Sequence, residues 1–383
     1  MKLIALIWLL SLSLQGQWIT GVYSAQNGVL PISNIPWSKY THIIHFAAAP
    51  NSDGTVSMYS LTQSNIDALI ASRPAGKKVI VEMADTGCCW SQATNSPGTI
   101  AAYVKNIVTF VNSNGYDGVD LDWEHNINTT QYVDLVTRLR NAMPTKLITM
   151  AVNADMTAAA AASQSKLDQV NAMCYDMDSW PGTASWYNGA LNGPSSYWSC
   201  AALTAKLTAA GVAPAKIGIG IPFYGRRWSG CTQVLVSPCT KQGYFAYRDL
   251  VADTTRWRSQ HRRYDIRYHS NYLSIPSLNE FDSYNGPEFM PDVVAWAKAK
   301  GFGGFLTFTI EYEYLSTQTG DAHYPLSTAL NKAVFDTAPL PPSHSNTTLY
   351  LYIGVTLLLA IALVGVWLRK DAGDTSALKT ESQ

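Results

Sequence analysis

The stretch YDGVDLDWEH, residues 116–125, places four acidic residues within eight positions, between two apolar segments of the chain. In a β-strand the side chains alternate between two faces, so this stretch would have one acidic face and one apolar face. The acidic face would carry Asp120, Asp122 and Glu124, and the apolar face would carry Val119, Leu121 and Trp123.

Such a row of acids is unfavourable in an ordinary strand, because strands are depleted in Asp and adjacent carboxylates repel one another. Inside a barrel or cleft, crowding and burial raise the pKa of one carboxyl group, so that it stays protonated near neutral pH. A group of this kind can serve as a general acid. A metal site is the alternative, although acids spaced by two along a strand rarely surround a cation without oxygen ligands from a loop. The stretch therefore favours catalysis.

Length and charge narrow the possible classes of protein. The chain has 383 residues, enough for one α/β barrel of about 250 residues or more with insertions, or for two ordinary domains. Its formal net charge is zero, which does not favour a nucleic acid as partner. No CxxC pair or cluster of histidines indicates zinc, and no cofactor is predicted.

Predicted strands and helices alternate along most of the chain. Eight strands with crossovers between them predict an α/β fold of the (β/α)8 TIM barrel type. An open doubly wound sheet is the alternative, but it usually has a phosphate-binding glycine turn, which this sequence lacks. A short insertion between strands seven and eight, residues 224–288, is expected to hold a helix over 244–253 and a strand pair over 264–275. The eight expected strands are 19–23, 40–48, 78–83, 116–125, 147–152, 169–175, 216–223 and 303–308.

The two ends of the chain predict export and a membrane anchor. Residues 1–17 have the pattern of a signal peptide, and the barrel is expected to occupy 18–337. A proline-rich stalk, 338–348, precedes twenty uncharged residues, 349–368, which as a helix of about 30 Å would cross a bilayer. Basic residues begin the tail 369–383 and place it in the cytoplasm. We expect a single-pass protein of the cell membrane with its catalytic domain extracellular, anchored by a C-terminal transmembrane helix.

Cysteines of an exported chain can form disulfides. Cys231 and Cys239 flank a short loop containing a proline, so they are the expected pair. The adjacent residues Cys88–Cys89 are not expected to bond to each other, and either could reach Cys200. Cys174 lies in an apolar predicted strand and is expected to be a buried thiol.

Two Asn-X-Thr sequences, beginning at Asn128 and Asn346, are acceptors for N-glycosylation. They require a host with the glycosylation machinery. Both lie in the part of the chain that is expected to be extracellular.

Several motifs resemble those of one family. DGVDLDWE, residues 117–124, is similar to the DGxDxDxE signature of glycoside hydrolase family 18, the chitinases and their relatives. YTHIIHFA at 40–47, NAMCYD at 171–176 and PFYGR at 222–226 resemble the family's motifs on the second, sixth and seventh strands. These motifs occur in the family's order, and the resemblance covers about residues 19–335.

The resemblance implies a chitinase-like glycosidase that cleaves β-1,4-linked N-acetylglucosamine polymers by substrate-assisted retaining catalysis. Together with the two ends of the chain, this predicts a membrane-anchored extracellular enzyme. Glu124 would protonate the glycosidic oxygen, and Asp122 would orient the 2-acetamido group that attacks the anomeric carbon. Asp120 would share a proton with Asp122. Tyr175 would donate to the acetamide oxygen, and Asp176 would support the same pocket.

The substrate-binding site and the exact substrate are less closely defined. In place of the serine and paired glycines that often end the family's third strand, this chain has residues 82–85, and Phe308 stands where a pocket-floor tryptophan is usual. The partner is chitin or another glycan containing N-acetylglucosamine. The alternatives are an endo-β-N-acetylglucosaminidase acting on N-glycan or peptidoglycan, and a non-catalytic chitin-binding lectin, although such lectins typically lose the acid. The residues expected to bind sugar are Tyr23, Trp90, Met173, Tyr224, Arg226 and Phe308.

Overall fold

Eight parallel strands close into a barrel in the computed structural model, which describes residues 17–25, 28–179 and 183–336. The ring closes because β1 pairs with both β14 and β2. A short strand, β3 (Val56–Ser57), pairs antiparallel with β2 outside the ring. The predicted TIM barrel is confirmed. In ring order the strands are β1 (Trp18–Tyr23), β14 (Gly304–Phe308), β8 (Ile217–Pro222), β7 (Gln169–Ala172), β6 (Leu147–Val152), β5 (Gly118–Leu121), β4 (Lys78–Met83) and β2 (His42–Pro50).

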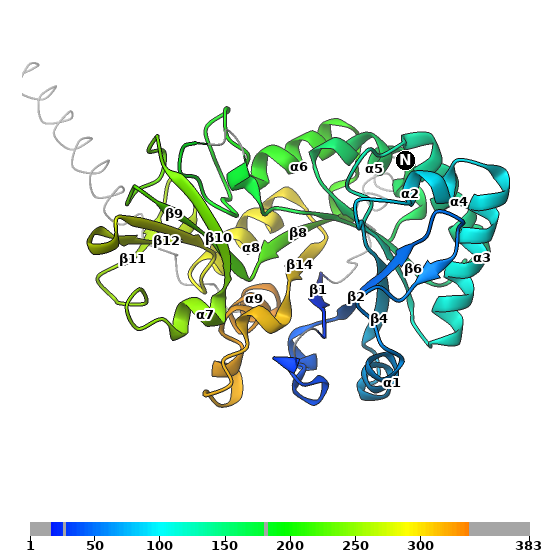
Figure 1. Cartoon of the computed structure of the whole chain (residues 1–383), viewed down its shortest axis with the longest axis horizontal. Coiled ribbons are helices and arrows are strands. Elements are labelled where there is room, and N and C mark those ends of the chain that lie inside the picture. Colours follow the sequence, from blue (N-terminus) through cyan, green and yellow to red (C-terminus); the bar gives the residue numbers. More distant parts are fainter. Residues whose placement is uncertain (1–16, 26–27, 180–182, 337–383) are drawn as a thin grey trace, which may run out of the picture. The chain divides into compact units, whose positions relative to one another are not determined.

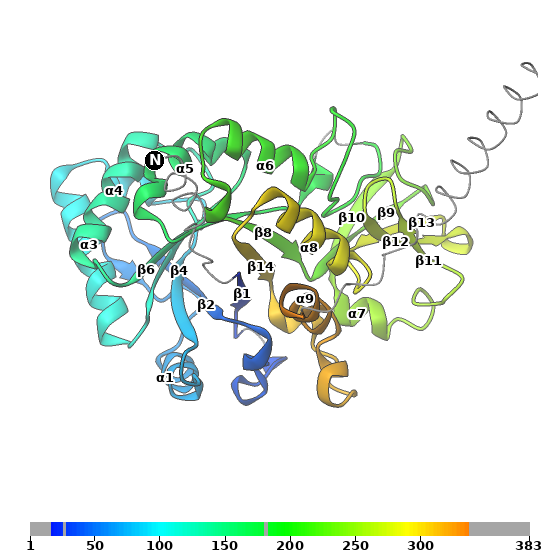
Figure 2. The same cartoon turned by 180° about the vertical axis from the view of Figure 1, so that it is seen from behind.

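Helices surround the barrel strands, as Figure 1 shows and as Figure 2 shows from behind. Polar side chains cap the N-termini of four of them; Ser96, for example, caps α3 in a reciprocal capping box with Thr99, and Asn128 caps α4. The apolar stripe of each helix then faces the strands. The helices around the barrel are α1 (Gln63–Ser72), α2 (Trp90–Thr94), α3 (Pro97–Ser113), α4 (Thr129–Ala142), α5 (Thr157–Ser163), α6 (Cys200–Ala209), α8 (Phe289–Lys300) and α9 (Pro325–Phe335).

Side chains of the strands divide into two apolar groups, as alternation requires. Val119 and Leu121 of β5 belong to the large core between strands and helices, and Trp123, just beyond the strand, joins them. The smaller group lies inside the barrel and contains Val22, Ile44, Ile80 and Leu306.

The insertion contains more strands than predicted. It contains a five-stranded antiparallel sheet in the order β10-β9-β13-β12-β11, where only one strand pair was expected. The prediction missed β9 (Tyr224–Ser229), β10 (Thr240–Ala246) and β13 (Glu280–Tyr284), because β9 follows β8 without a turn sequence and its partners are distant in the chain. The other strands, β11 (Arg262–Asp265) and β12 (Ser270–Ile275), match the predicted pair. The helix α7 (Tyr247–Ala252) lies within the predicted range 244–253, but residues 244–246 belong to β10 instead. In Figure 1 this sheet lies beside the barrel, on the left.

The disulfides differ from expectation at two of three places. The predicted bond between Cys231 and Cys239 is confirmed. Cys174 is bonded to Cys200, so the expected buried thiol is wrong: the end of β7 lies against the start of α6, with Cα atoms 4.8 Å apart. The neighbours Cys88–Cys89 are bonded to each other, contrary to prediction. The left-handed backbone of Cys89, with φ of 79°, turns the two side chains of this pair toward each other.

Several predictions fall partly or wholly outside the described residues: the signal peptide 1–17, the stalk 338–348, the span 349–368, the tail 369–383 and the acceptor Asn346. Within the ranges that the structure describes, no helix is long and apolar enough to cross a bilayer. The other predicted glycosylation site, Asn128, is exposed. Its side-chain oxygen accepts a hydrogen bond from the backbone N–H of Gln131.

Candidate active site

The acidic row lies at the carboxyl end of β5. The strand itself ends at Leu121, but the backbone N–H of Asp122 donates to the carbonyl of Met83 at 3.1 Å, which continues the parallel run beside β4. The alternation of faces is therefore kept beyond the strand. Asp120, Asp122 and Glu124 all line one cavity of about 200 Å³ in the barrel mouth.

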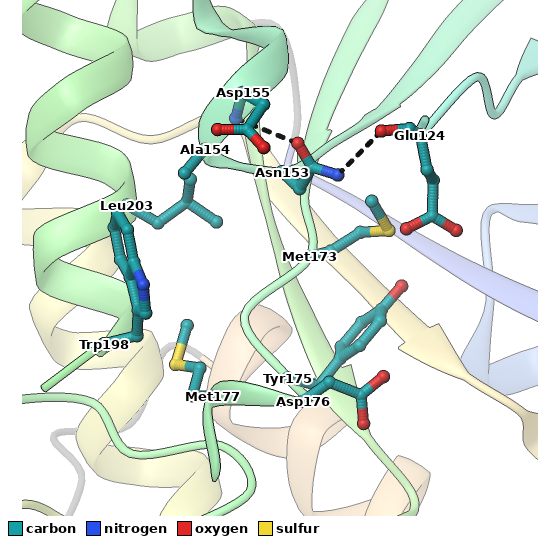
Figure 3. A pocket seen from close by; sticks show the side chains of 10 residues that line it. All are labelled: Glu124, Asn153, Ala154, Asp155, Met173, Tyr175, Asp176, Met177, Trp198 and Leu203. Atoms are coloured by element: carbon teal, nitrogen blue, oxygen red, sulfur yellow. Dashed lines mark hydrogen bonds between the residues drawn. The ribbon is translucent and has the colours of Figure 1, made fainter. Parts of the chain in front are cut away.

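Glu124 is half-buried, and both neighbouring strand ends hold its backbone. Its N–H donates to Asp85 Oδ2 at 2.8 Å, and its carbonyl oxygen accepts from Asn153 Nδ2 at 3.4 Å. Figure 3 shows its carboxyl group and the Tyr175 hydroxyl facing the same space. Burial raises the pKa of Glu124 above its ordinary value, and the nearby charge of His125 offsets part of this rise. These conditions suit a proton donor.

Asp120 and Asp122 lie deeper than Glu124, with exposed fractions of 1% and 8%. Thr149 Oγ donates a hydrogen bond to Asp120 Oδ1. Burial raises the pKa of Asp120 to about 6, although the bond from Thr149 acts against the rise. Burial, and then the charges of Glu124 and Asp120, raise the pKa of Asp122 well above its usual range. The row therefore retains protons at a pH where isolated carboxyl groups are ionised.

The segment after β7 forms the opposite wall. Met173 and Tyr175 line the central cavity, and burial with the charge of Asp122 raises the pKa of Tyr175 well above its usual value, so its hydroxyl stays a donor. Asp176 has a left-handed backbone, with φ of 56°, and its N–H donates to Asn188 Oδ1 at 3.1 Å. The hydroxyl of Tyr224 donates to Asp176 Oδ1 at 3.0 Å. This network holds Asp176 at the cavity edge.

Three cavities adjoin one another across the barrel mouth. The central one shares Glu124, Met173, Tyr175 and Asp176 with an outer cavity of about 390 Å³, whose lining includes Trp198 (Figure 3). On the other side, a cavity of about 430 Å³ shares Asp176, Tyr224 and Phe308 with the centre. Together they form a groove, and Glu124 lies where its outer and central cavities meet. Aromatic rings and carboxyl groups at intervals along a groove match the alternating faces and hydroxyls of a sugar chain.

Three of the six residues expected to bind sugar do not line this groove. Tyr23 is in the outer core and donates from its hydroxyl to the carbonyl of Leu30, because alternation along β1 turns Val22 into the barrel instead. Trp90 is 1% exposed and stacks on Trp123 with ring centroids 5.5 Å apart, beside a separate cavity.

Arg226 is the third. Its guanidinium forms an ion pair with the buried Asp178 at 2.7 Å and lies 3.2 Å from the centre of the Tyr244 ring. Tyr244 does line the groove. Arg226 therefore supports the wall of the groove from behind.

Other residues of the site were not predicted. Glu82 and Asp85 line the central cavity, while Asn153 and Asp155 line the outer one. Each lies at or just after the carboxyl end of a barrel strand, where TIM barrels carry their functional groups, and this position was the signal available in the sequence. In the described part of the chain, no group of three or more His, Cys, Asp or Glu side chains has an arrangement that would hold a metal ion.

Comparison with known families and proteins yields one matching family. The model of glycosyl hydrolases family 18 matches residues 19–313. Chitinase A1 of Niallia circulans is 26% identical over 71% of this chain, which covers 46% of that protein's length. Nod factor hydrolase protein 1 of Medicago truncatula is 26% identical, and the alignment covers 77% of this chain and 86% of that protein.

Solved structures with the same fold include both a chitinase and an agglutinin. The Group IV chitinase of Ostrinia furnacalis superimposes with a TM-score of 0.72 at 18% identity, over 83% of this chain and 99% of that one. The chitinase-like agglutinin of Robinia pseudoacacia has a TM-score of 0.68 at 22% identity, over 82% of this chain and 99% of that one. At these identities the likeness establishes the barrel fold.

Proposed function

Because the chain belongs to family 18 of the glycosyl hydrolases, we propose that it hydrolyses β-linked N-acetylglucosamine polymers of the chitin type. One observation carries the proposal: Glu124, with a raised pKa, lies where two cavities of the groove meet, beside two more deeply buried aspartates. A groove open on both sides of an acid can hold a sugar chain across the bond to be cleaved.

The proposed reaction has two steps. Glu124 gives its proton to the bridging oxygen, and the bond from that oxygen to the anomeric carbon breaks. The carbonyl oxygen of the sugar's own 2-acetamido group forms a bond to the same carbon, giving an oxazolinium intermediate. Water then attacks the anomeric carbon and gives a proton to the Glu124 carboxylate. The leaving acetamido oxygen takes back its electron pair, and configuration is retained.

Asp122 and Tyr175 act on the acetamido group in this proposal. Asp122 accepts a hydrogen bond from the acetamide N–H and stabilises the positive charge that develops on the oxazolinium ring. The Tyr175 hydroxyl, which stays protonated, donates to the acetamide oxygen and aims it at the anomeric carbon. Phe308 offers its ring as the floor on which the sugar packs, since it lines the two cavities next to Tyr224.

A lectin on the same barrel is the second candidate, and the likeness to a chitinase-like agglutinin favours it. A sugar-binding protein does not need a proton donor, whereas the acid position here is occupied by Glu124 at the groove. Hydrolysis of N-glycan cores or peptidoglycan is a variant of the first candidate, because the proposed chemistry uses the acetamido sugar and not the remainder of the polymer.

One product analysis separates these candidates. The full-length chain in mild detergent is incubated with chitin oligomers, glycopeptides and peptidoglycan fragments, and the products are identified by mass spectrometry. We expect shortened oligomers from chitin chains and none from the other two substrates. Binding of chitin oligomers without any cleavage would instead identify a lectin.

We further propose that the protein is a single-pass protein of the cell membrane with its barrel extracellular. The support is the uncharged segment 349–368 followed by basic residues. The expected result is that the intact chain sediments with membranes and is released by detergent but not by high salt. Recovery of the intact chain in the soluble fraction would contradict the anchor.

A further inference from the structure

We propose that Glu82 is a positioning residue of the acidic row, a neutral carboxylic acid that donates a hydrogen bond to the Asp120–Asp122 pair. The inference rests on the proposed function of that row. It adds a fourth acid from a different strand, outside the stretch 116–125.

Glu82 reaches the row through strand register. β4 and β5 are parallel neighbours, and Glu82 stands directly opposite Asp120. Val81 and Met83 on either side of it belong to the outer core, so alternation turns Glu82 into the barrel. Its side chain is 4% exposed and lines the same central cavity as Asp120, Asp122 and Glu124.

Two buried oxygens in the row have no hydrogen-bond partner within the described residues: Asp120 Oδ2 and Asp122 Oδ1. The other oxygen of Asp120 accepts from Thr149. Buried acceptors without donors are rare, because each lacks the hydrogen bonds it had in water. An ionised Glu82 would only add acceptors, whereas a protonated Glu82 supplies one O–H.

The charges around Glu82 favour the neutral form. No basic side chain is among the described residues that line the central cavity, and His125 lies outside it against Asp85. The neighbouring strand β2 contributes only Phe46 to this lining, and β14, elsewhere in the ring, contributes only Leu306 and Phe308. Burial, and then the negative charges of Asp122, Asp120 and Glu124, raise the pKa of Glu82 well above its ordinary value. The titratable side chains that line the cavity with Glu82 are Tyr59, Asp85, Asp120, Asp122, Glu124, Tyr175, Asp176 and Tyr224.

A neutral donor at this place acts on the reaction through the aspartates. It keeps a negative charge from forming beside Asp120, and it holds the pair in the orientation in which Asp122 meets the acetamido group. Because the charge on the sugar develops in the transition state, a change at Glu82 should alter kcat more than KM.

Two substitutions at this position test whether Glu82 acts as a hydrogen-bond donor or only fills the space in the barrel. Glu82→Gln keeps the volume and an N–H donor, and Glu82→Met keeps the volume without a donor. On a chromogenic chitotrioside we expect Glu82→Met to lose about 10- to 100-fold in kcat with KM nearly unchanged. Glu82→Gln should keep most of the wild-type rate. Wild-type kcat in Glu82→Met, or an equal loss in both variants, would overturn the proposal.

A second measurement does not need hydrolysis. In the wild type the folded chain holds the Glu82 proton, while the unfolded chain releases it above about pH 4.3. The stability that this proton provides is therefore complete below that pH and is lost as pH rises toward the raised pKa of Glu82. The glutamine side chain in Glu82→Gln does not titrate. We expect the melting temperature of this variant, relative to the wild type, to increase steadily from pH 4 to pH 8.

The kinetic and melting measurements distinguish a wrong proposed function from a wrong inference about Glu82. If no variant and no wild-type protein hydrolyses any sugar, the proposed function is wrong, and the melting series still decides whether Glu82 is neutral. A difference in melting temperature that does not change between pH 4 and pH 8 would show that Glu82 is ionised, and would overturn the inference whether or not the wild type is active.

Discussion

Glu124→Gln lowers kcat of the full-length protein on a chromogenic chitotrioside by about 10²- to 10⁴-fold, while the affinity for the sugar changes little. The glutamine side chain fits the same space but has no proton to transfer to the bridging oxygen. The backbone bonds that hold position 124, to Asp85 and Asn153, do not depend on its side chain. Initial rates and isothermal titration with a chitin oligomer measure the two effects separately.

The role of Glu124 as general acid also sets the direction in which the hydrolysis rate changes with pH. A general acid must be protonated, so the wild-type rate falls as pH rises through the raised pKa of Glu124. This limb should disappear from the residual rate of Glu124→Gln. Glu280→Gln is a matched control, because Glu280 pairs with Arg256 on the insertion sheet, and its kinetics should follow the wild type. Equal rates for wild type and Glu124→Gln would remove Glu124 from the mechanism.

Asp122→Asn is expected to lower kcat by about 10²- to 10³-fold and to leave KM within a few-fold of the wild type. The asparagine keeps the shape of Asp122, but it has no carboxyl proton to pass to Asp120 and so cannot take up the negative charge that stabilises the oxazolinium. Since that charge on the substrate appears only on the way to the transition state, ground-state binding loses little. Steady-state kinetics together with oligomer binding test both parts.

Asp134→Asn is the control for this substitution. Asp134 is partly exposed on α4 and forms a surface ion pair with Arg138 at 2.8 Å, so its loss should change neither constant. A rise in KM with unchanged kcat in Asp122→Asn would contradict the assigned role, because it would make Asp122 a group that binds the substrate and transition state equally.

Local pattern was sufficient for the regular elements of the barrel. The apolar runs at Lys78–Met83 and Leu147–Val152 form strands with the predicted bounds. In the strand after α5, the regular pairing ends at Ala172, three residues before the predicted end, because the backbone then bends toward the cavity with Asp176 in a left-handed conformation. Antiparallel pairing within the insertion joins segments far apart in sequence, and no local pattern indicated it.

Local pattern likewise predicted some residues of the active site correctly and others not. Alternation within β5 places Asp120 and Asp122 on the face that points into the barrel. The same rule places Val22 inside the barrel and Tyr23 outside it, but the sequence alone did not show which face of β1 points inward. Trp90 was expected to bind sugar because it follows a strand, but packing against Trp123 buries its side chain. Burial of a residue outside the barrel strands depends on its neighbours in space.

The sequence by itself determined the parallel barrel and the acidic face of β5, because the periods of strands and helices and the spacing of the acids are local properties. Only the tertiary structure decided that Glu82 stands opposite Asp120, that Asp85 holds the backbone of Glu124, and that Cys174 bonds to Cys200. These contacts depend on register between segments that the chain separates by 26 to 39 residues. Register is set when many side chains pack at once, and no single stretch of sequence contains it.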